Sequence, residues 1–170
     1  MKIALIGGTG SFGTALAVRL REAGYEVVIG SRDAERARSV AGELGVEGAT
    51  NEDAARAADF VVLTTKADGA VETARSLREA IGGTPVLSVA AELSFTKEGV
   101  FPTPEATSIA QRIQDELDAP VIAGLHSLAA SNLGGEEAPG EDTLVCGDDA
   151  DAKAAEPQLA LQVDPGVGIA

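Results

Sequence analysis

The hydrophobic positions of this chain fall into short continuous runs, separated by longer stretches in which apolar and polar residues recur with a helical period. Short apolar runs bounded by Gly, Pro, Asn or Asp are typical of strands that are buried on both faces of a parallel sheet. The runs predict strands at residues 2–6, 26–29, 46–49, 59–65, 86–89, 120–125 and 143–147.

The stretches between these runs place apolar residues three or four positions apart, which is typical of amphipathic helices. They predict helices at residues 14–23, 33–44, 51–58, 66–81, 103–117 and 149–161, with N-caps at Asp33, Asn51 and Thr103. Residues 90–103 show no clear period and are expected to form an irregular loop or connector. The alternation of strand and helix predicts the α/β class, with a doubly wound parallel sheet and right-handed crossovers.

A glycine turn follows the first predicted strand and opens the first predicted helix. Gly8, Gly10 and Gly13 have the G-x-G-x-x-G spacing of dinucleotide-binding turns. The first glycine permits a tight turn, the second lets the backbone approach a pyrophosphate, and the third lets the helix pack closely. Backbone N–H groups and the positive end of the helix dipole then bind the phosphates. A purely structural turn is the alternative.

The residues that end the second strand indicate which dinucleotide binds. An NAD site carries an acidic residue there, about 20 residues after the glycines. This chain has Ser31 and Arg32, a hydroxyl and a guanidinium that can bind a 2′-phosphate. Arg36 lies one helical turn after Arg32, while Asp33 is interpreted as an N-cap. We therefore expect the site to bind NADP(H). The alternative is that these arginines only form a solvated helix face, which is a reasonable interpretation for Arg38.

These features predict a Rossmann NADP-binding fold that forms a single domain over residues 1–170. Residues 1–90 are expected to form the dinucleotide-binding half, and residues 91–170 a second half that supplies the acceptor side of the cleft. A chain of 170 residues is long enough to bury one complete core.

The charge of the chain narrows the choice of partners. A net charge of −14 argues against nucleic acid and against an anionic membrane surface. Residues 1–88 hold 10 Lys and Arg against 12 Asp and Glu, whereas residues 89–170 hold 3 against 15. The basic side chains are thus concentrated in the half that would receive a phosphorylated dinucleotide.

The cysteine and histidine content indicates the cellular compartment and whether a metal site is expected. With one cysteine, Cys146, no internal disulfide can form, which suits a reducing cytoplasm. No signal peptide is recognisable, and no apolar run approaches the roughly 20 residues that a membrane span requires, so we expect a cytoplasmic protein with no membrane partner. One histidine and one cysteine give no metal-ligand cluster, and no metal is expected.

Six short segments, spread over nearly the whole chain, match one known family in order. They are Ile6–Gly10, Gly30–Arg32, Asn51–Ala55, Val62–Thr64, Leu125–Ser127 and Val145–Asp149. In these segments the chain resembles the NADPH:coenzyme F420 oxidoreductases, which are NADPH-dependent 8-hydroxy-5-deazaflavin reductases. The resemblance implies an oxidoreductase that transfers a hydride between NADP(H) and coenzyme F420.

The resemblance also implies roles for individual residues. The pyrophosphate would be held by Thr9, Gly10, Ser11 and Phe12, the 2′-phosphate by Ser31, Arg32 and Arg36, and the cofactors would be flanked by Thr64, Ala67, Val71, Arg75, His126 and Ala130. No acid or base is assigned, because hydride transfer between two bound cofactors chiefly requires positioning. His126 is either a cofactor contact or a histidine whose hydrogen bonds are structural.

The chain departs from the family in three places. Thr65-Lys66-Ala67 stands where the family usually has Ile-Pro and an aromatic residue, and Ala129 stands where it usually has Pro. Family members usually also continue beyond the equivalent of residues 166–170, so the C-terminal part is expected to be shorter than usual. These departures concern the deazaflavin pocket and the dimer contacts, and a homodimer stays open. The alternatives are an NADP-dependent reductase of another small acceptor and a noncatalytic NADP-binding or redox-sensing module.

Overall fold

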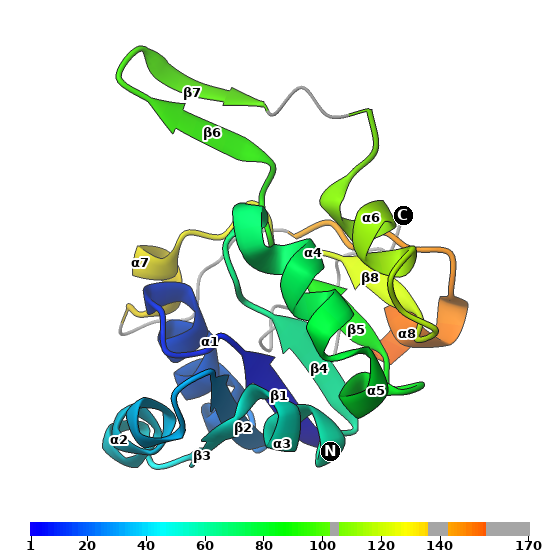
Figure 1. The fold of residues 1–170 in the computed structure, drawn as a ribbon. Coiled ribbons are helices and arrows are strands. Elements are labelled where there is room, and N and C mark those ends of the chain that lie inside the picture. The colour runs from blue at the N-terminus through cyan, green and yellow to red at the C-terminus, as the bar shows by residue number, and fades with distance from the viewer. Residues whose placement is uncertain (103–105, 136–142, 156–170) are drawn as a thin grey trace.

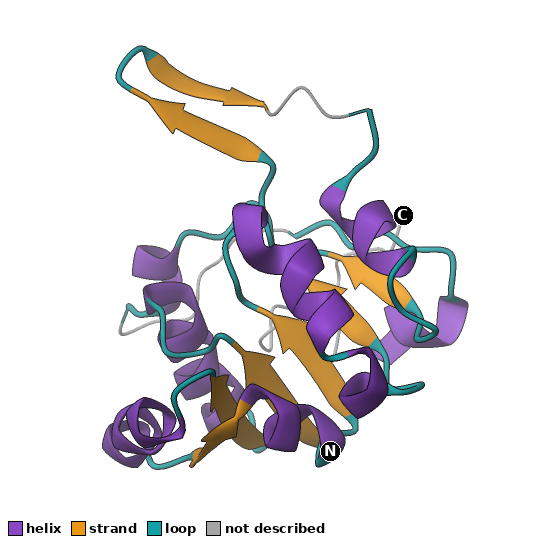
Figure 2. Ribbon diagram, viewed as in Figure 1, coloured by secondary structure: helices purple, strands orange, loops and turns teal. Residues whose placement is uncertain are grey.

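A parallel sheet forms the centre of the molecule (Figures 1 and 2). In the parts of the chain that the computed structural model describes, residues 1–102, 106–135 and 143–155, the sheet has six strands in the order β3-β2-β1-β4-β5-β8. The strands are β1 (Lys2–Ile6), β2 (Glu26–Ser31), β3 (Glu47–Thr50), β4 (Phe60–Leu63), β5 (Val86–Ser88) and β8 (Val121–Ala123). The order reverses beside β1, which confirms the doubly wound sheet.

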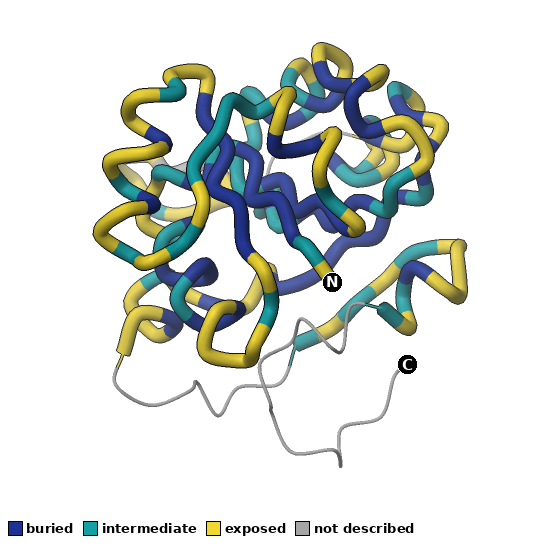
Figure 3. Tube along the Cα trace, turned by 90° about the horizontal axis from the view of Figure 1, so that it is seen from below, coloured by how far each residue is buried: buried dark blue, intermediate teal, exposed yellow. Residues whose placement is uncertain are grey.

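Helices cover both faces of this sheet. One face carries α1 (Ser11–Glu22), α2 (Ala34–Leu44), α7 (Ala130–Leu133) and α8 (Ala150–Ala155), and the other carries α3 (Asn51–Arg56), α4 (Ala67–Ser76), α5 (Arg78–Ile81) and α6 (Ile109–Gln114). Successive strand residues point to opposite faces, so Leu5 and Ile29 pack under α1 while Ile6 and Val28 pack under α3. Nearly all residues of β1, β2, β4, β5 and β8 are therefore buried, which explains their continuous apolar runs, whereas the edge strand β3 has no buried residue. Figure 3 shows the buried residues gathered in the middle of the molecule.

The register of the strands brings the predicted site residues to one edge. Ile6 at the end of β1 pairs with Gly30 on one side and with Leu63 on the other. The carboxyl ends of β1, β2 and β4 therefore lie together, and the segments that follow them leave the sheet at the same edge.

Several predicted elements need correction. The helix predicted at 66–81 is divided into α4 and α5 at Leu77. The helix predicted from Thr103 begins instead at Ile109, because Ser108 forms a capping box with Gln111; the predicted N-cap at Thr103 lies outside the described residues. The predicted strand at 143–147 is also wrong.

That segment has an apolar sequence but little burial. Leu144 is 80% exposed, and only Cys146 pairs with the sheet, through an isolated antiparallel bridge to Ala123. The helix predicted at 149–161 is described as α8 up to Ala155, and the remainder of its predicted range lies outside the described residues.

The segment expected to be an irregular loop contains a β-hairpin. Its strands β6 (Leu93–Thr96) and β7 (Gly99–Pro102) pair antiparallel and project from the body as an arm (Figure 1). The Thr96 hydroxyl holds the turn, since it accepts from the N–H of Glu98 and donates to the carbonyl of Gly99. Strands of four residues are too short to give a clear period in the sequence.

Candidate functional site

A cleft of about 840 Å³ lies at the carboxyl edge of the sheet, where the strand order reverses. Open α/β sheets bind their ligands at this position. Residues from five separate segments line it, among them Ser11, Thr64, Val89, Ile109 and His126. The cleft therefore joins the glycine turn to the second half of the chain.

The glycine turn is closely packed on one side and open on the other. A Cβ on Gly13 would lie 2.6 Å from the Cα and carbonyl oxygen of Gly8, so only glycine allows α1 to start this close to the turn. Around Gly10 the nearest atom to an added Cβ is 4.0 Å away. Gly10 is also the N-cap of α1 and supplies no side-chain cap. The N–H groups of the first turn of α1 are therefore placed to bind an anion.

Asn51 holds the glycine turn from the neighbouring helix. The N–H of Gly7 donates to Asn51 Oδ1 over 3.1 Å. A Cβ on Gly30 would lie 2.8 Å from the same oxygen, so the glycine of the Gly30–Arg32 segment makes room for this contact. The prediction of Asn51 as an N-cap is wrong, because Thr50 is the N-cap of α3 and accepts from the N–H of Asp53. Asn51 is thus a positioning residue, and its place directly after β3 was the available signal.

The end of β2 is followed by two arginines for which the described part of the chain supplies no partner. Ser31 is buried, and its hydroxyl accepts from the N–H of Asp33. The Asp33 carboxylate in turn accepts from the N–H groups of Glu35 and Arg36, which confirms it as the N-cap of α2. The guanidinium groups of Arg32 and Arg36 are exposed and bind no other described residue.

Among the described residues, most of the other arginines have partners, although Arg38 on α2 has none. Arg19, Arg56, Arg75, Arg78 and Arg112 each form an ion pair with a carboxylate. Two free guanidinium groups beside a buried hydroxyl give the end of β2 the donors that a phosphate monoester requires.

The two threonines after β4 have different surroundings. Thr64 donates both its N–H and its hydroxyl to the carbonyl of Ile6, at 3.0 and 2.8 Å, and so ties β4 to β1. Thr65 lines the cleft, and its Oγ1 is buried without a hydrogen-bond partner in the part of the chain that the structure describes. A buried hydroxyl without a partner favours a ligand that supplies one.

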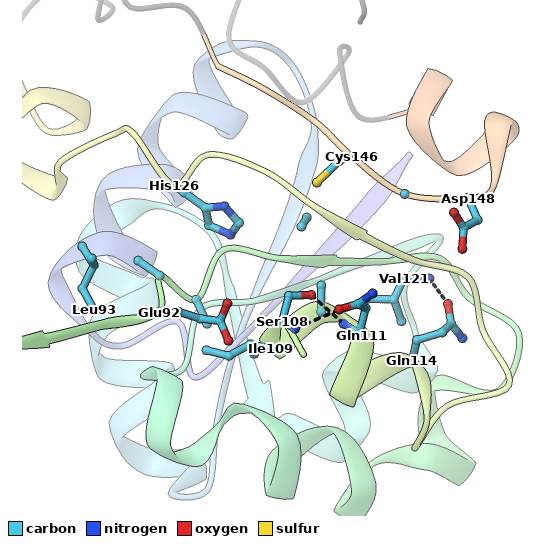
Figure 4. Close-up of a pocket in the computed structure, with 15 residues that line it drawn as sticks. Glu92, Leu93, Ser108, Ile109, Gln111, Gln114, Val121, His126, Cys146 and Asp148 are labelled. Atoms are coloured by element: carbon cyan, nitrogen blue, oxygen red, sulfur yellow. Dashed lines mark hydrogen bonds between the residues drawn. The ribbon is translucent and has the colours of Figure 1, made fainter. Parts of the chain in front are cut away.

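His126 extends into the cleft from a strained turn. Leu125, just before it, is buried and has a φ of 60°, a conformation that costs energy in a branched residue. His126 itself is exposed and lines both this cleft and a second cavity of about 610 Å³ beside α6 and β8 (Figure 4).

Three residues that the resemblance placed beside the cofactors, Val71, Arg75 and Ala130, lie outside the cleft lining. Val71 on α4 packs against the hydrophobic cluster under α3 to α6. Ala130 begins α7, which is held to α1 by a hydrogen bond from Arg19 Nε to the carbonyl of Leu133. Arg75, one turn after Val71, binds Glu116 through two hydrogen bonds. The roles of Val71, Arg75 and Ala130 therefore stay predictions.

The described residues show no group of three or more His, Cys, Asp or Glu side chains close enough to hold a metal ion. Within the same residues, no helix combines the length and the apolar character that crossing a bilayer requires.

Comparison with known proteins identifies the family. Residues 2–92 match the family described as NADP oxidoreductase, coenzyme F420-dependent. The F420-dependent NADP reductase of Methanothermobacter thermautotrophicus is 36% identical over 96% of this chain and 78% of its own length, and that of Methanocaldococcus jannaschii is 33% identical over 96% and 80%. A structure from Arthrobacter sp. FB24, provisionally assigned as an F420-dependent NADP reductase, superposes with a TM-score of 0.81 at 27% identity, covering 96% of this chain and 81% of that one. The chain belongs to the family of coenzyme F420-dependent NADP oxidoreductases.

Proposed function

We propose that the protein transfers a hydride between NADP(H) and coenzyme F420. The observation that carries this proposal is the open glycine turn, whose Ser11 and Phe12 line a cleft that continues to His126, together with two arginines beside the turn that bind no other described residue. Relatives that match nearly the whole chain are named F420-dependent NADP reductases, which supports the second cofactor.

In this proposal the first half of the chain holds the dinucleotide. The first-turn N–H groups of α1, from Ser11 and Phe12, bind the pyrophosphate. The Ser31 hydroxyl and the Arg32 guanidinium bind the 2′-phosphate, and Arg36 adds charge one helical turn later. Asn51 keeps the turn in place through the N–H of Gly7. Residues 1–90 thus act as the dinucleotide-binding half of a single domain.

The second half supplies Ile109 and His126 to the acceptor side of the cleft, and Thr65 and Val89 of the first half line the same cleft. Thr65 Oγ1 lacks a partner among the described residues and can hydrogen-bond the nicotinamide carboxamide. Val89, Ile109 and His126 line the same cleft and exclude water from the space where the two rings meet.

When both cofactors are bound, the hydrogen and electron pair at C4 of the nicotinamide pass to C5 of the deazaflavin, and one proton from solvent completes the reduced deazaflavin. The chain therefore needs no nucleophile, and its residues act by binding and orienting the two rings. The proposal places the protein in the cytoplasm, with small molecules rather than nucleic acid as partners, and it leaves a homodimer open.

The test is to mix the purified protein with NADPH and F420 and to follow the loss of absorbance of both cofactors. The expected result is loss of the two in equal amounts. Imines and 3-hydroxy acids, with NADPH or NADP⁺ as each requires, form the comparison panel. Turnover with one of these but none with F420 would contradict the proposal in favour of another acceptor. Tight NADPH binding with no reduction of any acceptor would instead favour a noncatalytic or sensing module.

A further inference from the structure

Arg112 meets its carboxylate through one long hydrogen bond, unlike the two arginines that bind a carboxylate from another helix or loop through several bonds, Arg75 and Arg78. Arg112 lies on α6, lines the cleft, and its side chain is 33% exposed. Its Nη2 donates a single hydrogen bond to Glu92 Oε1, over 3.2 Å. By contrast, Arg75 makes two hydrogen bonds to Glu116 and Arg78 makes three to Asp118. The pairing of Arg112 is the loosest of these.

The Arg112 guanidinium also has an unused donor. Its Nε is buried and has no hydrogen-bond partner among the described residues. A buried N–H without a partner is costly, and guanidinium groups favour two parallel bonds to one anion. A ligand with two oxygens that met Nε and Nη2 together would satisfy the buried donor and would displace Glu92.

The ion pair of Arg112 and Glu92 lies on the acceptor side of the cleft. Glu92 lines the second cavity, on the same side as His126 and Leu93 in Figure 4, whereas Arg112 lines the cleft. His126 and Ile109 line both spaces. The ion pair therefore lies where the cleft and the second cavity adjoin.

Arg112 is a rare positive charge in an acidic part of the chain. It is the only arginine in residues 89–170, a region with 3 basic and 15 acidic residues. An anion that approaches this side meets repulsion except where a cation is available. Among the residues that line the cleft, Lys66 and Arg112 carry the positive charges.

The backbone position of Arg112 is set by the capping and packing of α6. The capping box of Ser108 and Gln111 defines the start of α6, and the buried Ile109 and Ile113 anchor the helix to the sheet. Glu92, in contrast, directly precedes β6 and belongs to the segment that leads into the projecting hairpin.

We propose that Arg112 forms an anion subsite for the hydride acceptor, and that Glu92 occupies this subsite as an internal competitor until the acceptor displaces it. The inference rests on the proposed function, because the acceptor is coenzyme F420. The ligand chemistry is an ionised group with two oxygens or an ionised ring oxygen. F420 has two sources of it, the hydroxy-deazaflavin ring and the phosphodiester and carboxylates of its side chain.

The experiment measures the dissociation constants of F420 and of NADPH, each by fluorescence titration, for wild type, Arg112→Ala and Glu92→Gln. Arg112→Ala should weaken F420 binding at least tenfold and leave NADPH binding within twofold. Glu92→Gln should tighten F420 binding about threefold or more, because the competitor is removed. If the ion pair were merely structural, both Arg112→Ala and Glu92→Gln would weaken F420 binding.

Matched controls separate the subsite from general effects. Arg78→Ala removes an arginine that pairs with Asp118 outside the cleft lining, and Glu98→Gln removes a carboxylate in the hairpin turn. Both should leave F420 affinity within twofold. Arg112→Lys keeps the charge but loses the bidentate geometry, so it should fall between wild type and Arg112→Ala, and it replaces the alanine variant if that variant does not fold.

A deazaflavin that has the ring but no phosphodiester side chain distinguishes the sources. If Arg112→Ala weakens binding of this compound as well, the subsite takes a ring oxygen; if only full F420 is affected, it takes the side chain. Both results support the subsite. If the wild-type protein binds F420, two results would overturn the inference while leaving the proposed function standing. One is an F420 affinity of Arg112→Ala equal to that of wild type, and the other is an F420 affinity of Glu92→Gln below that of wild type. Wild type that does not bind F420 would overturn the proposed function together with it.

Discussion

The dinucleotide-binding side of the site and the acceptor side of the cleft hold their arginines differently. On the dinucleotide side, Arg32 and Arg36 lie outside the cleft lining, are exposed and bind no described residue, and Asn51 accepts a hydrogen bond from the glycine turn beside them. On the acceptor side, Arg112 is partly buried and is engaged by Glu92. The difference indicates that the first site is ready for its anion, whereas the second must release an internal carboxylate first.

The largest expected effect comes from adding one methyl group to the turn. Gly13→Ala would place Cβ 2.6 Å from the backbone of Gly8, so we expect the unfolding free energy to fall by about 1–3 kcal/mol. The change should also displace two or more charge-assisted hydrogen bonds between the turn and the pyrophosphate. The binding of NADPH and of NADH should therefore weaken by about a hundredfold or more. Chemical denaturation and nucleotide titration measure both effects.

Gly10→Ala is the control, since an added Cβ there meets only Gly7 O at 4.0 Å. This variant should fold within about 1 kcal/mol of wild type and yet bind both nucleotides more weakly, because the methyl group enters the space of the pyrophosphate. Normal nucleotide binding by Gly13→Ala would contradict the description of the turn.

A selective effect is expected from Arg32→Ala. The wild-type protein should bind NADPH at least tenfold more tightly than NADH, which is about 1.4 kcal/mol. Loss of the guanidinium should cost NADPH binding roughly 1.5–3 kcal/mol and NADH binding little, as measured by calorimetric titration. Arg36→Ala should act in the same way but more weakly. Arg38→Ala serves as the control, and an equal loss for both nucleotides in Arg32→Ala would make that residue structural.

A smaller, unselective effect is expected from Asn51→Ala. This change removes the hydrogen bond to the N–H of Gly7, so both nucleotides should lose about 0.5–1.5 kcal/mol of binding free energy. Thr50→Ala removes the cap of the same helix and should lower stability by about 1 kcal/mol without a specific loss of binding. If the two variants behave identically, Asn51 has no positioning role.

The smallest effect concerns a surface pair outside the cleft lining. Hydrogen bonds from Arg75 lower the pKa of the Glu116 carboxyl. The pair therefore stabilises the protein above the ordinary carboxyl pKa of about 4.3, and this contribution is lost as the pH falls through the lowered value. Wild type should melt slightly above Glu116→Gln at neutral pH, and the difference should close in acid. A difference that grows in acid would contradict the assignment.

Local sequence was sufficient to predict much of the dinucleotide side. Glycine spacing, apolar runs and the Asp33 cap are set by neighbouring residues, and the structure reproduces the sheet and the cap that they predict. Asn51 was misread because its role depends on Gly7, 44 residues away in the sequence.

The acceptor side depends more on distant contacts. α7 was not predicted, and it is held to α1 by a hydrogen bond between residues 114 positions apart. The pairing of Arg112 with Glu92 spans 20 positions and the unpredicted hairpin. No local pattern encodes such contacts, so the sequence predicted the strand that leads to His126 but not the groups around it.

The most direct test of the account follows the transferred hydrogen itself. NADPH carrying deuterium at C4 of the nicotinamide, on one face at a time, is incubated with the protein and F420, and the reduced F420 is analysed by mass spectrometry and NMR. We expect that one of the two labelled forms delivers its deuterium to C5 of the deazaflavin without loss to solvent. Reduced F420 without deuterium from either form, or no reduction by protein that binds both cofactors, would contradict direct transfer across this cleft.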